Sequence, residues 1–258
     1  DNVIQAMCGM MEMTGFPDDV PTKVGPAIGD NFTGLTMALA ITMAYYHKLQ
    51  TGKGQQLDVA MMDCLFGIME SPIMYKELLN EEISRCGNTD PTLFPYDVYP
   101  CKDGYFSVGV AAGSKSEWER FCNAIAMPEL LQEEKYSTNE SRVALYDELT
   151  QKILPFFASK TKAELNDIFL ACNLPCSPVN TIPELMEHPQ LKARNMLIPL
   201  KDDGVGEYLA MGNPMMMSET PATIEKGAPA MGRDTEKILQ EAGYTTAEIE
   251  TFMQNEIC

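Results

Sequence analysis

The segment Lys23-Val-Gly-Pro-Ala-Ile-Gly-Asp30-Asn-Phe-Thr-Gly34 places one carboxylate between a glycine-bearing apolar stretch and a long apolar run. We expect the stretch before Asp30 to be a strand. The apolar residues after it recur at helical spacing and predict a helix over residues 33–49. Gly52 is expected to end that helix. Asp30 would then stand at the entry to the helix, where a strand and a helix meet.

Asp30 has two interpretations from its position alone. An aspartate at a helix entry commonly caps the helix by accepting a main-chain hydrogen bond. The same location favours an ionised carboxylate, and the neighbouring Gly29 and Gly34 would let a substrate come close to the backbone. A carboxylate can attack a thioester carbonyl and form a mixed anhydride. The residues around Asp30 leave both a cap and a nucleophile open.

Composition excludes several classes of function. The chain has 258 residues, enough for one large domain or two modest ones, and a formal net charge of −18. Such a charge argues against binding to nucleic acid or to an anionic membrane surface. No apolar run reaches the roughly 18 residues of a membrane helix. The eight cysteines are irregularly spaced and form no zinc set with the two histidines, so we predict reduced thiols, a cytoplasmic location and no metal.

The chain divides into four predicted parts. Residues 1–80 combine the long helix with a predicted strand at 56–61 and a predicted helix at 62–79, an alternation typical of an α/β layer. Residues 81–100 are polar and interrupted by Gly and Pro, which predicts a linker or a lid. Within them Arg85–Asp90 could close over a site, and a solvated linker is equally open.

The remaining two parts are mainly helical. Residues 101–180 should form a small domain with a strand after an Asp-Gly turn, followed by helices at 116–126, 140–158 and 162–173. Residues 181–258 are expected to return to the large domain, with helices near 182–195 and 235–242. Ser116 with Glu119, and Thr245 with Glu248, have the spacing of capping boxes.

Several short motifs, read in order, closely resemble the class III CoA-transferases. This is the family of formyl-CoA transferase and of the carnitine and 2-hydroxyacyl CoA-transferases. The resemblance covers essentially the whole chain, and the order and spacing of the motifs make it specific. The matching segments are Gln5 to Gly15, Pro21 to Asp30 with Thr33-Gly34, Thr51-Gly-Lys-Gly-Gln55, Asp58 to Met61, Gly87-Asn88 with Pro95-Tyr96, Asp103-Gly-Tyr105, Pro175 to Val179 and Met231 to Thr235.

The resemblance implies a fold and an activity. The fold would be α/β, part of a Rossmann-like large domain with an inserted smaller α+β domain. The activity would move CoA from an acyl-CoA to a free carboxylic acid, with Asp30 as the nucleophile that becomes an aspartyl-CoA thioester. The resemblance further implies CoA thioesters as substrates, no permanently bound cofactor, and an interlocked homodimer. Residues at the CoA or substrate site would be Asp1, Gly29, Gly87 and Asn88.

Two departures from the family pattern qualify this picture. The lid of the formyl-CoA member is a run of glycines, which Arg85–Asp90 lacks. Family members also carry an N-terminal nucleotide-binding half that supplies most contacts to CoA, and these 258 residues do not contain it. We expect the chain to be a fragment or to pair with a polypeptide that supplies that half.

Two further functions remain open at this point. An α-methylacyl-CoA racemase belongs to a sister branch of the same fold and uses an acid/base pair, normally with a histidine before the aspartate. No histidine precedes Asp30 in these residues. The other possibility is a non-catalytic chain that only pairs with a catalytic subunit.

Overall fold

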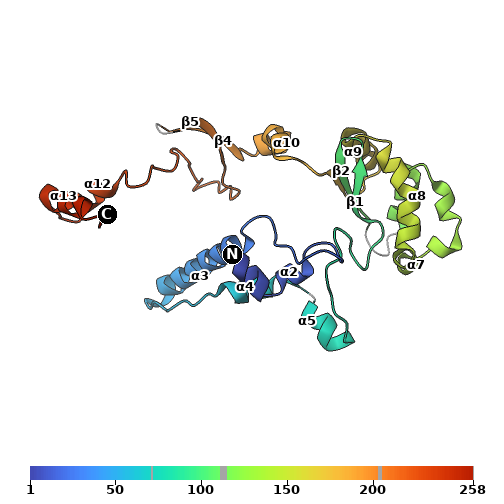
Figure 1. Ribbon diagram of the computed structural model, residues 1–258, viewed down its shortest axis with the longest axis horizontal. Coiled ribbons are helices and arrows are strands. Elements are labelled where there is room, and N and C mark those ends of the chain that lie inside the picture. Colours follow the sequence, from blue (N-terminus) through green and yellow to red (C-terminus); the bar gives the residue numbers. More distant parts are fainter. Residues whose placement is uncertain (71, 111–114, 203–204, 258) are drawn as a thin grey trace. The chain divides into compact units, whose positions relative to one another are not determined.

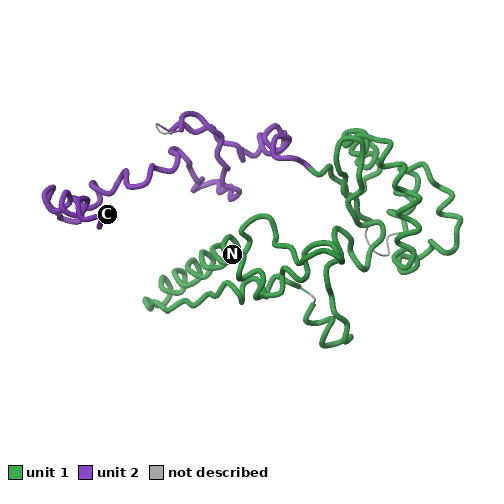
Figure 2. The backbone as a smooth tube through the Cα atoms, in the orientation of Figure 1, with its two compact units in different colours: residues 1–179 green, residues 180–258 purple. Residues whose placement is uncertain are grey.

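The computed structural model describes residues 1–258 apart from 71, 111–114, 203–204 and 258 (Figure 1). Its contacts separate two compact units, unit 1 over Asp1–Val179 and unit 2 over Asn180–Cys258 (Figure 2). Each unit is described by itself below. No helix in the described part of the chain combines the length and the apolar character needed to cross a membrane.

The first part of unit 1 is helical. The long helix α3 packs against α4, and α1 contacts both. The predicted helix at 33–49 is confirmed, and Gly52 ends it with a left-handed backbone, φ 71°. The helices here are α1 (Asn2–Met7), α2 (Met10–Met13), α3 (Ile28–Thr51), α4 (Met61–Gly67), α5 (Pro72–Met74) and the π-helix η1 (Tyr75–Leu79).

Three local predictions for this part are wrong. The stretch before Asp30 is irregular, and α3 starts at Ile28. Residues 56–60 form no strand, because no neighbouring strand pairs with them in the described part of unit 1. The helix predicted at 62–79 is broken into α4, α5 and η1, with Gly67 and Pro72 at the interruptions.

The second part of unit 1 combines a small sheet with helices. Three antiparallel strands lie in the order β1-β2-β3, and the Asp103-Gly turn joins the first two with Tyr99 opposite Phe106. The helix predicted at 140–158 is interrupted at Leu145. Ser116 lies inside α6, so the capping box predicted for it is wrong. The elements are β1 (Tyr96–Cys101), β2 (Gly104–Gly109), α6 (Lys115–Ala124), η2 (Pro128–Leu131), η3 (Glu134–Tyr136), α7 (Asn139–Ala144), α8 (Tyr146–Ala158), α9 (Lys162–Ala171) and β3 (Cys176–Pro178).

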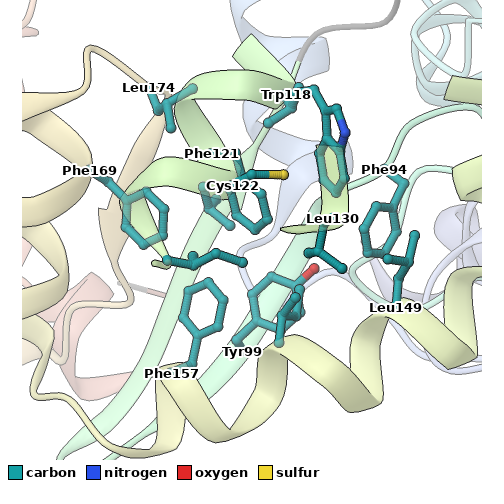
Figure 3. Packing of buried hydrophobic residues seen from close by; sticks show 14 of the residues in the cluster. Phe94, Tyr99, Trp118, Phe121, Cys122, Leu130, Leu149, Phe157, Phe169 and Leu174 are labelled. Atoms are coloured by element: carbon teal, nitrogen blue, oxygen red, sulfur yellow. The ribbon is translucent and has the colours of Figure 1, made fainter. Parts of the chain in front are cut away.

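An aromatic core holds this second part together. Tyr99 of β1 stacks on Phe157 of α8 with ring centroids 4.4 Å apart, and further rings continue the cluster (Figure 3). Trp118 belongs to this cluster and is 3% exposed, and the guanidinium of Arg142 lies over its ring, 4.7 Å from the ring centroid. All members of the buried cluster fall between Phe94 and Leu174. The core of unit 1 therefore lies in this part and not around α3.

The surface of α3 is unusual for an exposed helix. Seven large apolar side chains along it are more than half exposed, namely Leu35, Leu39, Ile41, Met43, Tyr45, Tyr46 and Leu49. At 100° per residue their positions spread over about 200° of the helix circumference. An apolar face this wide is normally covered by other parts of a folded protein.

Unit 2 has little core of its own. In its described residues, Leu200 and Ile249 are the buried hydrophobic side chains. Strands β4 and β5 pair as an antiparallel hairpin. The predicted capping box at Thr245 and Glu248 is confirmed at the start of α13. The elements are α10 (Ile182–Glu187), α11 (Pro189–Ala193), β4 (Leu197–Asp202), β5 (Gly206–Met211), α12 (Thr235–Glu241) and α13 (Thr246–Gln254).

Candidate active site at the start of helix α3

Asp30 lies in the first turn of α3 and does not cap it. The cap position is Ala27, and Asp30 is the acidic residue of the first helical turn. Its side chain is 60% exposed. The capping interpretation of Asp30 is therefore wrong, and so is its predicted place before the helix. The carboxylate is accessible and lies close to the positive end of the helix dipole.

The carboxylate of Asp1 supplies the missing cap. The main-chain N–H of Gly29 donates to Oδ1 of Asp1 at 2.8 Å. This bond satisfies one of the N–H groups that the first turn of a helix leaves free. The main-chain nitrogen of Asp1 lies 3.7 Å from Oδ1 of Asp30. The structure thus brings together three of the residues predicted for the site: Asp1, Gly29 and Asp30.

Gln5 completes this arrangement, and the sequence analysis missed it. The residue is fully buried, 0% exposed. Its Nε2 donates to Oδ2 of Asp1 at 2.8 Å, and its Oε1 accepts the main-chain N–H of Val24 at 2.9 Å. The available signal was a single amide inside the apolar run Val3-Ile-Gln-Ala-Met, a polar residue where a buried one would be apolar.

Gly29 is required by close packing of two helices. A Cβ atom at this position would lie 2.8 Å from Cγ2 of Ile4 and 3.0 Å from Oδ1 of Asp1. Helix α1 can therefore approach the start of α3 only because residue 29 has no side chain. Gly34 differs, since a Cβ there would meet nothing within 4 Å.

The segment 85–90 is attached to the loop after α2. The N–H of Gly87 donates to the carbonyl of Gly15 at 2.8 Å, and Arg85 forms an ion pair with Glu12 at 2.9 Å. Gly87 has φ +70°, and a Cβ there would lie 2.7 Å from the ring of Phe16. These bonds run to residues 12–15 and not to Asp30. The structure therefore does not bring Gly87 and Asn88 into the cluster of Asp1, Gly29 and Asp30.

A cavity of about 370 Å³ lies beside this segment. Its walls are mainly apolar and aromatic, and the lining residues include Met13, Met69, Tyr75, Ile83, Cys86 and Tyr96. Asp30 is not one of the lining residues.

The described residues hold no group of three or more His, Cys, Asp or Glu side chains that could bind a metal ion. The cysteines in the described part of the chain are free thiols. The start of α3 presents the exposed carboxylate of Asp30 beside the partly buried carboxylate of Asp1 and the buried amide of Gln5.

Comparison with known proteins identifies the family. A family model described as CoA-transferase family III matches residues 1–235, and the chain belongs to this family. It is 34% identical over 247 residues to the succinyl-CoA:mesaconate CoA-transferase of Haloarcula hispanica, covering 95% of this chain and 61% of that protein. It is 32% identical over 244 residues to the succinate–glutarate CoA-transferase of Agrobacterium fabrum, covering 93% of this chain and 60% of that protein.

More distant relatives and a solved structure agree with this. The formyl-CoA:oxalate CoA-transferase of Rhodopseudomonas palustris is 28% identical over 273 residues, covering 96% of this chain and 63% of that protein. A crystal structure of a CAIB/BAIF family protein from Brucella suis matches with a TM-score of 0.79 at 31% identity, covering 93% of this chain and 62% of that one. The predicted α/β fold of the class III CoA-transferases is confirmed. The chain spans 60–63% of the length of these relatives.

Proposed function

We propose that the complete protein is a CoA-transferase that moves CoA from an acyl-CoA to a free carboxylic acid, with Asp30 as the nucleophile. The observation that carries the proposal is the exposed carboxylate of Asp30 in the first turn of α3, freed from capping by Asp1. Family membership supports it, and so do the names of the relatives, which describe exchange of CoA between carboxylic acids.

The reaction proceeds in balanced steps. An oxygen of Asp30 attacks the thioester carbonyl, the C–S bond breaks, and CoA leaves as a thiolate from a mixed anhydride. The thiolate then attacks the acyl carbon of Asp30, which releases the donor acid and leaves an aspartyl-CoA thioester. The acceptor carboxylate attacks this thioester and forms a second anhydride. The thiolate finally attacks the acceptor's carbonyl, which regenerates the Asp30 carboxylate.

Two features of the surroundings stabilise Asp30 before it reacts. Asp30 lies at the positive end of the α3 dipole, which attracts negative charge. The bond from Gly29 to Asp1 fixes the main chain next to the nucleophile. CoA acts as a substrate in this scheme, and it requires no permanently bound cofactor.

Mass spectrometry tests the proposal directly. Trypsin cleaves after Lys23 and Lys48, so Asp30 lies on the peptide 24–48. Full-length protein incubated with acyl-CoA should carry CoA on this peptide, and hydroxylamine should remove it. Asp30→Asn and Asp30→Ala should lose both the adduct and turnover, whereas the exposed Asp18→Asn should keep both. Undiminished turnover in Asp30→Asn would contradict the assignment.

A racemase would need a second acid/base group beside Asp30, and helix α3 does not supply one. His47 lies near the far end of the same helix, about 25 Å away at 1.5 Å per residue. Exchange of the substrate's α-hydrogen with solvent deuterium, in the absence of an acceptor acid, would favour the racemase over the transferase. A full-length protein that binds no CoA in calorimetry would favour a non-catalytic chain.

The assembly and location are also proposals. We keep the division into a large domain (1–80), a linker or lid (81–100), a small domain (101–180) and a return segment (181–258), although residues 96–100 of the linker range already belong to strand β1. An interlocked homodimer is supported by the uncovered apolar side chains of α3, which a larger assembly would bury. Free thiols throughout the described chain support a cytoplasmic location. Gly87 and Asn88 remain candidates for CoA contact on complete assembly.

A further inference from the structure

We infer that Gln5 is a positioning residue for Asp30, acting through the carboxylate of Asp1. The inference rests on the proposed function, since it concerns the rate at which Asp30 reacts. Its basis is a polar side chain that is 0% exposed and is hydrogen-bonded on both sides of its amide.

The amide of Gln5 joins three segments. Its Oε1 accepts the N–H of Val24, in the irregular segment that leads into α3. Its Nε2 donates to Oδ2 of Asp1, whose other oxygen accepts the N–H of Gly29. A continuous path of hydrogen bonds therefore runs from the segment before α3 to the residue adjacent to the nucleophile.

This position requires a side chain that accepts one hydrogen bond and donates another. A primary amide both accepts from a main-chain N–H and donates to a carboxylate, which an ionised carboxylate or an ammonium group cannot do. The side chain of Asp1 is only 14% exposed, so its Oδ2 depends on a protein donor. Without the Gln5 donor, a nearly buried anionic oxygen would lose its partner, and Asp1 would turn toward water. The N–H of Gly29 would then lose its acceptor.

The effect should fall on reaction and not on substrate binding. Gln5 is buried behind Asp1, so no substrate atom reaches it. Loss of the amide should displace the first turn of α3 and slow the attack by Asp30, because small displacements of a reacting group lower the rate strongly. The expected signature is a lower kcat with an unchanged KM for the acyl-CoA.

Protonation gives a readout that a purely structural role would not produce. The charged or titratable groups near Gln5 include Asp1 at the start of its own helix, Asp30 on α3, the thiol of Cys8, which donates to the Gln5 carbonyl at 3.6 Å, and Lys23, which donates to the carbonyls of Val24 and Gly25. Helices α2 and α4 also contact α1 and carry Glu12, and Asp63 with Cys64, respectively. In Gln5→Glu an ionised carboxylate would face the Asp1 carboxylate and repel it. Once protonated, Glu donates its O–H to Asp1 and restores the bond, so activity should return at low pH.

The experiment uses full-length protein as wild type, Gln5→Glu, Gln5→Met and the matched control Gln151→Glu at an exposed position on α8. Single-turnover formation of the CoA adduct on peptide 24–48 is followed from about pH 8.5 to about pH 5.5, with kcat and KM at each pH. At the alkaline end both Gln5 variants should form the adduct about tenfold more slowly or worse. Gln5→Glu should recover toward wild type on acidification, Gln5→Met should not, and Gln151→Glu should match wild type throughout.

Three results would overturn the inference. The first is a rate of adduct formation in Gln5→Glu equal to that of wild type at alkaline pH. The others are a Gln5→Glu rate that is reduced by the same factor at every pH, or a change in Gln5→Glu that is confined to KM. Circular dichroism checks the fold of each variant, and if Gln5→Met does not fold, the pH recovery of Gln5→Glu decides. A wild-type protein that forms no adduct on peptide 24–48 refutes the proposed function, and the role of Gln5 falls with it. An adduct in wild type with unaffected Gln5 variants refutes the role of Gln5 alone.

Discussion

The carboxylate of Asp1 caps the helix that carries Asp30, through a 2.8 Å hydrogen bond from the N–H of Gly29. This relationship separates two roles that a single aspartate would otherwise combine. A cap residue commits its oxygens to main-chain N–H groups, and an oxygen so engaged is a weaker nucleophile. Because Asp1 accepts that bond, the exposed carboxylate of Asp30 is not committed to capping α3 and stays accessible for the proposed reaction.

Substituting Gly29 should be costly, whereas substituting Gly34 should not. The Cβ of Gly29→Ala would overlap Ile4 and Asp1, so we expect the free energy of unfolding to fall by about 1–3 kcal/mol. Gly34→Ala introduces the same methyl group five residues along α3 into open space and should stabilise by up to about 1 kcal/mol. Chemical denaturation of the two variants measures the difference. Equal shifts would show that α1 does not pack against residue 29.

Gly87 should hold the segment 85–90 in place. Alanine at this position combines an unfavourable backbone of φ +70° with a contact to Phe16, so we expect the segment to detach from the loop after α2. Detachment should accelerate tryptic cleavage after Arg85, which the ion pair with Glu12 otherwise restrains. Gly54→Ala, where a Cβ meets nothing within 4 Å, is the control and should leave the cleavage rate unchanged. An unaltered rate in Gly87→Ala would contradict this role.

The capping box of α9 should give a stability contribution that depends on pH. Hydrogen bonds from the main chain and side chain of Thr161 lower the pKa of Glu164. The folded state therefore holds the proton less tightly than the unfolded chain. The contribution is fully present above the ordinary carboxyl pKa and is lost as the pH falls through the lowered value.

Replacing Glu164 by Gln keeps the capping geometry and removes the charge. The difference in unfolding free energy between wild type and Glu164→Gln should be constant near neutral pH and should shrink below about pH 4.5. Denaturant titrations at neutral and acidic pH measure it, with the exposed Glu119→Gln of α6 as the control. A difference that does not change with pH would mean that the Thr161 bonds do not depend on the charge of Glu164.

Local sequence patterns predicted the elements whose signals lie within a few residues. The apolar spacing of α3, its end at Gly52 and the capping box at Thr245 are all of this kind. The strand predicted at 56–61 was wrong because alternation shows only that a segment can be extended. A strand also needs a partner, which the described part of unit 1 does not offer it.

The site was predictable only in part for a related reason. The sequence motif predicted the role of Asp30, which stays a proposal, but the cap of its helix comes from Asp1, 28 residues before Gly29 in the sequence. The start of α3 was placed too late because the stretch before Asp30 was interpreted as a strand, and the packing of Ile4 against Gly29 is not visible in the sequence. Gln5 was missed because its partners, Asp1 and Val24, come together only in the fold. The lid role of residues 85–90 stays a prediction.

The position of Trp118 allows intrinsic fluorescence to report on the aromatic core of this chain. It is the single tryptophan of the chain, is 3% exposed, and stacks on Phe121 with ring centroids 5.7 Å apart. Its emission should be blue-shifted in the native state and should move to longer wavelength when the aromatic core loosens. Since the proposed site residues Asp1, Gln5 and Asp30 lie outside that core, fluorescence separates variants that damage folding of the small domain from variants that impair the proposed reaction alone.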